Sequence, residues 1–358
     1  MKITSAVVSV VLLVSAQNSF GQFPAEEVSR FAIKDFTFES GQAFPTAVVA
    51  YATRGRLNAA KSNAVLLPSP YAADLHGYDA FIGPGRALDP QRHFLILTGM
   101  FANGQSSSPS NTPAPHGGPD FPRVTIRDNV RAAHELVTQQ LGITKMTAVV
   151  GYSMGAQQAY QWAVSYPDMV ESIAVICGNA KQYPFGVIRL EGSIAALKAD
   201  SAWNNGRYTQ PPVKGLRAFA IHYAAWSQSP VSWPRDMLDS MSNQQVDQFL
   251  RSLEAPALGM DANNVLSQAE TWKRHNIGDS PGYNGDVEAA LRAIKARVLL
   301  MPCRSDLYFP VADAEYEATF LQNGELAVIE SSAGHAAGGG ADSQAIRFID
   351  GKLKGMLQ

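Results

Sequence analysis

A serine between two glycines is the first feature of the chain that could do chemistry. Ser153 lies at the centre of Gly-x-Ser-x-Gly, residues 151–155, after the apolar run 146–150 and before the helix-compatible residues 156–166. A strand that turns sharply into a helix strains its turn residue and tolerates only small residues two positions to either side. The pattern predicts a nucleophile elbow, in which the N–H of Met154 faces any oxyanion that forms.

A serine hydroxyl needs a base beside it, and that base needs a carboxylate to fix its tautomer. On a sheet of this kind the order along the chain is serine, acid, histidine. His335 follows the apolar run 326–330 in a loop of small residues, and Asp306 follows the run 297–301. We therefore predict that these two residues and Ser153 form a catalytic triad.

Other acids and histidines fit this order less well. Asp342 lies after the histidine in the chain, and Asp279 lies in a long helical segment, so both are fallback candidates for the acid. His275 ends the charged sequence Trp-Lys-Arg-His, which is typical of a solvated surface residue.

The loop after the apolar run 64–67 should supply a second oxyanion donor. It reads Pro68-Ser69-Pro70-Tyr71, and a proline has no N–H to donate. Ser69 and Tyr71 remain, and we prefer Tyr71 for its distance past the strand. Each such donor typically contributes about 3 kcal/mol of transition-state stabilisation.

Short apolar runs alternate with amphipathic stretches along the chain, which predicts a mostly parallel sheet with helices on both faces. Residues 36–38 are expected to add an antiparallel edge strand. Thr125 and Asp128 form a capping-box start for a helix that stops at Gly142. The other expected strands are residues 47–51, 64–67, 93–98, 146–150, 172–176, 297–301 and 326–330.

The strand pattern stops for more than a hundred residues after residue 178. We predict an inserted helical cap, or lid, at residues 179–292, between core segments 22–178 and 293–358. Four of the five tryptophans lie in it, and filling a small helical core is the simplest role for each. They are Trp203, Trp226, Trp233 and Trp272.

Composition narrows the class of protein. The chain has 358 residues, of which 46% are hydrophobic and 17% charged, as in an ordinary globular enzyme. A net charge of −2 offers no electrostatic reason to bind nucleic acid or an anionic membrane. Cys177 and Cys303 are the only cysteines, and each ends an apolar run. They could pair, but adjacent strands give poor disulfide geometry, so we favour two buried free thiols and expect no metal site.

The first residues predict a signal peptide. Lys2 precedes an apolar stretch, residues 6–16, that is too short to span a bilayer stably. Small residues suit cleavage after Ala16 or Gly21, which gives a signal peptide of residues 1–16 or 1–21 and a secreted or periplasmic protein. The alternative is a buried N-terminal strand or helix.

With these residues placed, the chain resembles the homoserine O-acetyltransferase group of α/β-hydrolases from about residue 65 to residue 337. The similar stretches are the elbow with Met154 and residues 82–89, 121–128, 162–167, 261–263 and 305–310. The resemblance implies an α/β-hydrolase fold with an eight-stranded sheet, a helical cap over a narrow tunnel, and often a homodimer through the cap. The family's nucleophile, acid, base and two oxyanion donors match Ser153, Asp306, His335, Met154 and Tyr71.

The chain departs from this family where an amino acid would bind. Residues 69–73 differ from the family's usual oxyanion loop, and Ala336 replaces an aspartate that members acetylating homoserine carry. Their carboxylate-binding cap arginine aligns without gaps to Ala220, although a shifted alignment would place Arg217 there. Burying both charges of an amino acid without partners costs several kcal/mol, so these departures argue against homoserine.

We therefore expect an exported serine hydrolase that cleaves a small ester or related acyl compound through an acyl-enzyme, without a cofactor. The alternative is an O-acyltransferase that uses acetyl-CoA, although this donor is cytosolic and the chain is expected to be exported. A minor alternative is a non-catalytic binding protein on the same fold. The partner in the first case is a small molecule, with no nucleic acid and no membrane after signal cleavage.

Overall fold

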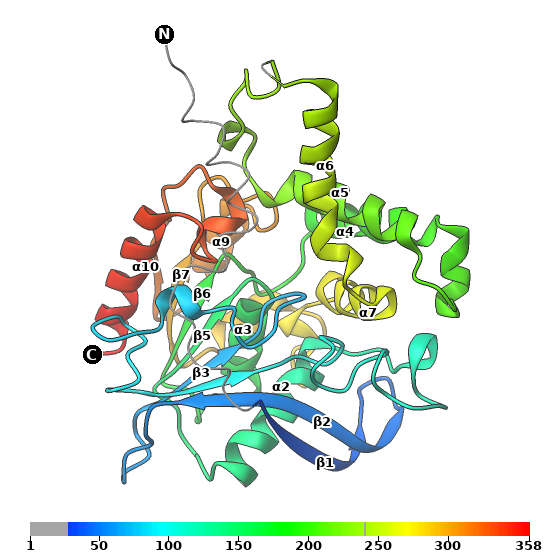
Figure 1. Cartoon of the computed structure of the whole chain (residues 1–358). Coiled ribbons are helices and arrows are strands. Elements are labelled where there is room, and N and C mark those ends of the chain that lie inside the picture. Colours follow the sequence, from blue (N-terminus) through cyan, green and yellow to red (C-terminus); the bar gives the residue numbers. More distant parts are fainter. Residues whose placement is uncertain (1–27, 240) are drawn as a thin grey trace.

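An eight-stranded sheet organises the chain in the computed structural model, which describes residues 28–239 and 241–358 (Figure 1). The sheet has the order β1-β2-β4-β3-β5-β6-β7-β8, and β1 and β2 pair antiparallel at one edge whereas β4 to β8 are parallel. This confirms the predicted α/β-hydrolase sheet. The strands are β1 (Ser29–Thr37), β2 (Ala43–Arg54), β3 (Ala64–Pro68), β4 (Phe94–Thr98), β5 (Ala148–Tyr152), β6 (Ser172–Ile176), β7 (Arg297–Met301) and β8 (Gly324–Leu326).

Among the strands that differ from their predicted bounds, β1 begins at Ser29 rather than at residue 36, and β8 differs from residues 326–330. β8 begins at Gly324, and after its end the Ala327 N–H donates to Leu300 O and Ile329 forms a bridge to Cys303. Ala327 and Ile329 are buried in the core beside α10. The apolar run therefore marks the packed part of this segment, whereas its main-chain pairing with β7 starts earlier.

Successive strand residues alternate between two cores, because their side chains point to opposite faces of the sheet. Leu66 and Ile96 pack with α2 (Ile126–Glu135) and α3 (Met154–Ser165) on one face. Leu67 and Leu97 pack with α10 (Ser343–Met356) on the other. The prediction of helices on both faces is confirmed.

The predicted start and end of one helix are confirmed in detail. The Thr125 hydroxyl oxygen accepts from the Asp128 N–H at 3.0 Å, and the Asp128 carboxylate accepts from the Thr125 N–H, which completes the capping box of α2. A π-helical turn, η4 (Leu136–Gln140), follows, and Gly142 adopts a φ of 63° at the stop.

Between β6 and β7 the described residues form helices and connecting loops, without a strand. Figure 1 shows α4 to α7 gathered on one side of the sheet, and several of their apolar residues share a core of their own. We propose that these helices form the cap, while α8 and Trp272 of α7 pack into the core beside α3. The α-helices between β6 and β7 are α4 (Pro184–Lys198), α5 (Val213–Ser227), α6 (Asn243–Leu258), α7 (Ala262–Lys273) and α8 (Val287–Arg292).

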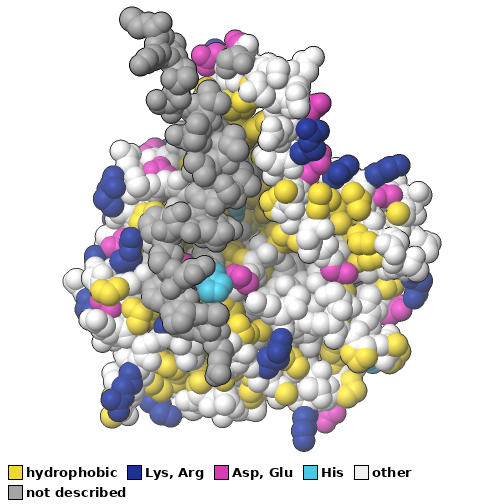
Figure 2. All heavy atoms as spheres, viewed as in Figure 1, with side chains coloured by type: hydrophobic (Ala, Val, Ile, Leu, Met, Phe, Trp, Pro, Cys, Tyr) yellow, Lys and Arg dark blue, Asp and Glu magenta, His cyan; other side chains and the backbone are white. Residues whose placement is uncertain are grey.

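Apolar side chains are also exposed on the cap. Figure 2 shows hydrophobic side chains around α4 to α6, where Phe185, Ile188 and Val213 are all exposed. The homodimer through the cap stays a prediction. The signal peptide, residues 1–16 or 1–21, lies outside the described residues, and within the described part of the chain no helix has the length and apolarity to cross a bilayer.

A buried carboxyl joins α9 (Val311–Ala318) to the start of the cap. Glu317 is fully buried, and its Oε1 accepts from the Ala180 N–H at 2.8 Å. Burial raises the pKa of Glu317 to about 8. The folded state therefore holds a proton on this group at pH values where the unfolded state has released it.

Replacing this carboxyl tests that linkage. Because the folded pKa is raised, wild-type stability should fall as pH rises from about 4.5 to about 8. Glu317→Gln stays neutral and keeps the acceptor, so its free energy of unfolding should gain on the wild type across that window. Urea unfolding at several pH values measures the difference. Glu315→Gln, exposed on the same helix, is the control, and a parallel response of both variants would contradict the expectation.

Candidate active site

The turn from β5 into α3 holds Ser153 in a strained conformation. Its φ is 57° and its ψ is −125°, a region that L residues rarely adopt. A Cβ atom on Gly151 would lie 2.1 Å from the carbonyl oxygen of Gly155, and one on Gly155 would lie 2.3 Å from that of Pro68. Both positions therefore require glycine, as the motif predicts.

The structure brings the three predicted triad residues together. The Ser153 Oγ lies 2.9 Å from the Nε2 of His335, and the Nδ1 of His335 lies 2.8 Å from the Oδ2 of Asp306. The other oxygen of Asp306 accepts from the backbone N–H groups of Tyr308 at 2.7 Å and Phe309 at 3.2 Å. All three side chains are buried, so the carboxylate is held in place and shielded from water.

Tyr152, the residue before the serine, holds the loop of His335. Its ring stacks on the imidazole with centroids 5.0 Å apart, and its hydroxyl donates to the His335 carbonyl oxygen at 3.1 Å. A Cβ atom on Gly338 would lie 2.9 Å from the Tyr152 ring. The glycines after the histidine therefore let the chain pass close to this ring.

Of the predicted oxyanion loop, only the Tyr71 N–H has no acceptor among the described residues. The Ser69 N–H donates to Thr98 O at 2.9 Å, and the Ala72 N–H donates to the side chain of Gln268 at 2.8 Å. Of the two donors that the sequence leaves open, Tyr71 is therefore the available one. The N–H of Met154 lies in the first turn of α3, where helical N–H groups have no intrahelical acceptor.

Two buried glutamines, which sequence reasoning missed, hold this loop. Gln158 of α3 donates to Ser69 O at 3.0 Å, and Gln268 of α7 also donates to Phe101 O at 3.2 Å. Amides at fully buried helix positions are the signal that could have found them, because a buried amide must be hydrogen-bonded.

The fallback residues have other roles. Asp342 caps α10, where it accepts from the Gln344 N–H at 2.8 Å, and Asp279 accepts from Asn276 at 3.0 Å. The prediction for His275 is wrong, since this residue is buried and burial lowers its pKa to about 3. His275 follows the end of α7, and its charged neighbours, the exposed Arg274 and the ion-paired Lys273, hid its inward position.

The cap arginine predicted by a shifted alignment is also absent from the site. Arg217 is half-exposed and pairs with Glu254 at 3.2 Å, and Ala220 is buried. Arg189 of α4, which the sequence analysis did not single out, is instead buried near the triad. Its guanidinium lies over the ring of Tyr308 at 4.0 Å. A lone cation between the apolar residues 187–188 and 190 was the available signal.

Both cysteines are buried and free, as predicted. The Cys177 sulfur lies within 4.8 Å of ligand atoms of Asp306 and His335. Burial raises the pKa of this thiol, so it stays protonated and is a poor metal ligand. The carboxylate and the imidazole are already bonded to each other, and this cluster therefore fits the triad better than a metal.

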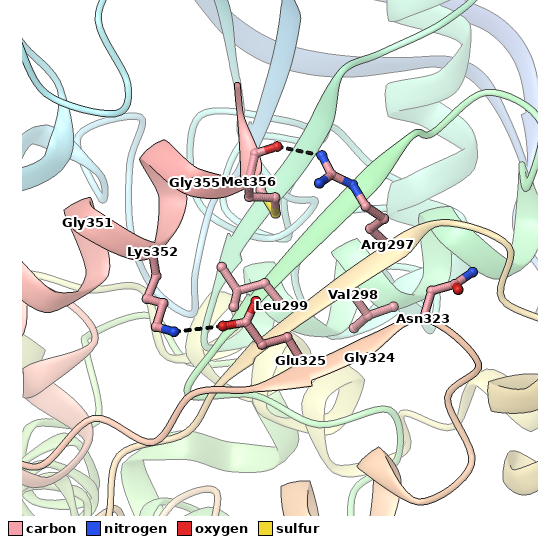
Figure 3. Close-up of a pocket in the computed structure, with 10 residues that line it drawn as sticks. All are labelled: Arg297, Val298, Leu299, Asn323, Gly324, Glu325, Gly351, Lys352, Gly355 and Met356. Atoms are coloured by element: carbon pink, nitrogen blue, oxygen red, sulfur yellow. Dashed lines mark hydrogen bonds and ion pairs between the residues drawn. The ribbon is translucent and has the colours of Figure 1, made fainter.

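A surface pocket of about 420 Å³ lies elsewhere (Figure 3). Arg297 and Val298 at the start of β7, Gly324 at the start of β8 and the end of α10 line it. Asp306 follows the opposite, carboxyl end of β7. Ligand sites of open α/β sheets lie at carboxyl ends, so this pocket takes no part in the chemistry of the triad.

Known proteins with the same architecture include hydrolases and transferases. The chain matches the alpha/beta hydrolase fold family over residues 63–338. It is 37% identical over 326 residues to an ethyl acetate hydrolase of Pseudomonas veronii, covering 89% of this chain and 92% of that protein. The structure of an acetylester hydrolase from Corynebacterium glutamicum matches with a TM-score of 0.86 and 34% identity, over 92% of this chain and 95% of the other. That of a homoserine O-acetyltransferase from Bacillus anthracis matches with a TM-score of 0.84 and 26% identity, over 93% and 97%.

The support of the oxyanion loop can be tested through Gln268. Gln268→Ala leaves the Ala72 N–H without its acceptor, so the loop should no longer hold the Tyr71 N–H in the direction of the oxyanion. The kcat for 4-nitrophenyl acetate should then fall about 10- to 100-fold. KM should change less, because the interaction is needed mainly in the transition state.

Gln161→Ala is the matched control for this variant. Gln161 is a buried amide of α3 that bonds Ser165 and Ser280, both at 2.8 Å, and not the loop. Equal losses of kcat in the two variants would mean that a buried amide matters only for stability.

Proposed function

Since the chain belongs to the α/β-hydrolase fold family, in its homoserine O-acetyltransferase-like group, we propose that it is a serine esterase that hydrolyses small esters. The observation that carries this proposal is the hydrogen-bonded series from the Ser153 hydroxyl through His335 to Asp306. A buried carboxylate, an imidazole and a serine at a nucleophile elbow are the parts that acyl transfer through an acyl-enzyme requires.

In the first half-reaction Ser153 Oγ attacks the ester carbonyl carbon while His335 Nε2 takes its proton. Asp306 holds the imidazole in the tautomer that accepts at Nε2 and stabilises the imidazolium that forms. The N–H groups of Met154 and Tyr71 bind the oxyanion. The bond to the leaving alcohol then breaks, and His335 returns its proton to the alkoxide oxygen.

In the second half-reaction His335 takes a proton from water, whose oxygen attacks the acyl carbon. The bond to Ser153 Oγ breaks, the serine regains a proton, and the carboxylic acid leaves. We propose water as the acceptor because identity is higher to the ester hydrolases, 37% and 34%, than to homoserine O-acetyltransferases, 26% to 32%. Ala336 also leaves the ammonium group of an amino acid without its usual partner, and Arg217 pairs with Glu254 rather than serving the substrate.

Replacing the nucleophile tests the proposal. Purified protein should hydrolyse 4-nitrophenyl acetate, and Ser153→Ala should lower kcat by at least about 10⁴-fold, because the covalent step is removed. A fluorophosphonate probe should label the wild type and not the variant. Homoserine-dependent release of CoA from acetyl-CoA that outpaces ester turnover would instead assign a transferase. Neither activity, together with no labelling, would favour a binding protein.

We also propose that the protein is exported, on the basis of the positive start and short apolar stretch of its first residues. The mature protein from its native host should then begin near Gln17 or Gln22. Mass spectrometry of the intact chain measures this, and a mature chain that starts at Met1 would contradict export.

A further inference from the structure

Arg189 is a buried cation without a hydrogen-bonding partner. Its side chain comes from α4 of the cap, and the residue is 3% exposed. Within the described residues its Nε and both terminal nitrogens have no hydrogen-bond acceptor. An arginine stays charged in proteins, and a buried charge is costly unless it is paired.

Four aromatic rings neighbour one another in a closed series, and the guanidinium lies over two of them. The centroid distances are 5.7 Å for Tyr71–Tyr223, 4.9 Å for Tyr223–Tyr308, 5.6 Å for Tyr308–Trp272 and 5.7 Å for Trp272–Tyr71. The guanidinium carbon lies 4.0 Å from the centroid of Tyr308 and 4.8 Å from that of Trp272. We call these four residues the aromatic quartet.

Contacts with ring faces stabilise a cation, but they leave its N–H groups unpaired. The five N–H donors of a guanidinium lie in its plane, as a fork that matches a carboxylate. The N–H groups of Arg189 therefore still need a negatively charged hydrogen-bond acceptor in the plane of the guanidinium. A buried cation with only a structural role is expected to have a carboxylate partner in the protein, as even the half-exposed Arg217 of α5 has in Glu254.

The aromatic quartet also places Arg189 beside the reacting groups. Tyr71 carries the oxyanion N–H, and the ring of Tyr308 lies 4.8 Å from the ring of His335. The ring of Tyr308 therefore neighbours both the guanidinium and the catalytic imidazole.

We propose that Arg189 binds a carboxylate of the substrate, so that the preferred substrate is a short ester that also carries a carboxylate group. This inference rests on the proposed esterase function and adds the substrate class. It differs from recognition of an amino acid, because an ammonium group would need an acid of its own. The Asp306 carboxylate, whose charge acts on Arg189, is already bound to His335.

Two isosteric esters test this proposal. Acetoxyacetate carries a carboxylate where acetoxyacetamide carries a neutral amide, and both release acetate. The wild type should have a higher kcat/KM for the acid than for the amide, by about 50-fold, and Arg189→Met should bring this ratio close to one. Arg189→Lys keeps the charge without the fork and should keep part of the preference. Arg217→Met, the matched control in the cap, should leave the ratio unchanged.

A second measurement uses the wild type alone, in case Arg189→Met does not fold. Glycolate should inhibit hydrolysis of 4-nitrophenyl acetate competitively, at concentrations where glycolamide does not. Turnover of both esters with a ratio near one, or equal inhibition by both products, would overturn the carboxylate site and leave the esterase intact. No turnover of any ester and no fluorophosphonate labelling of Ser153 would instead overturn the esterase itself.

Discussion

The strained backbone of Ser153 is the constraint on which the rest of the site depends. A φ of 57° at a residue that is not glycine persists only when the surrounding structure enforces it. Here the start of α3 lies too close to Gly151, and the Pro68 carbonyl of β3 too close to Gly155, for a Cβ atom at either position. The Ser153 N–H donates to Ile176 O of β6 at 3.0 Å, which ties the turn to the neighbouring strand.

The same turn also places the groups around the serine. The Tyr78 hydroxyl donates to Pro68 O at 2.7 Å and accepts from the Tyr152 N–H at 3.0 Å, so it joins the end of β3 to the end of β5. Pro68 begins the oxyanion loop, and Tyr152 packs on His335. One turn thus positions Ser153, His335 and the proposed oxyanion loop relative to one another.

Burial gives these polar groups their strength and also limits what the site accepts. Both oxygens of the Asp306 carboxylate have hydrogen-bond donors, because two backbone N–H groups bind one oxygen and the imidazole binds the other. Arg189 has no such balance within the described residues, and its charge is met only by ring faces. In a low-dielectric site an unpaired charge is costly, and this difference supports the proposal that Arg189 binds a ligand.

Features of the fold and of the site that depend on local geometry can be predicted from the sequence alone. A Gly-x-Ser-x-Gly between a strand and a helix, the Thr125 capping box and the strand ends before Asp306 and His335 are short-range patterns, and the structure has the eight strands that they imply. Strand bounds were less accurate at β8, because an apolar run reports packing rather than pairing.

Which residues far apart in the chain come together at the site depends on the tertiary fold. Gln268 reaches the oxyanion loop across nearly two hundred residues, His275 is buried despite charged neighbours, and Arg189 rather than Arg217 enters the site. The physical reason is that the direction of a cap side chain depends on how the cap helices pack over the sheet. No local pattern along the chain encodes that packing.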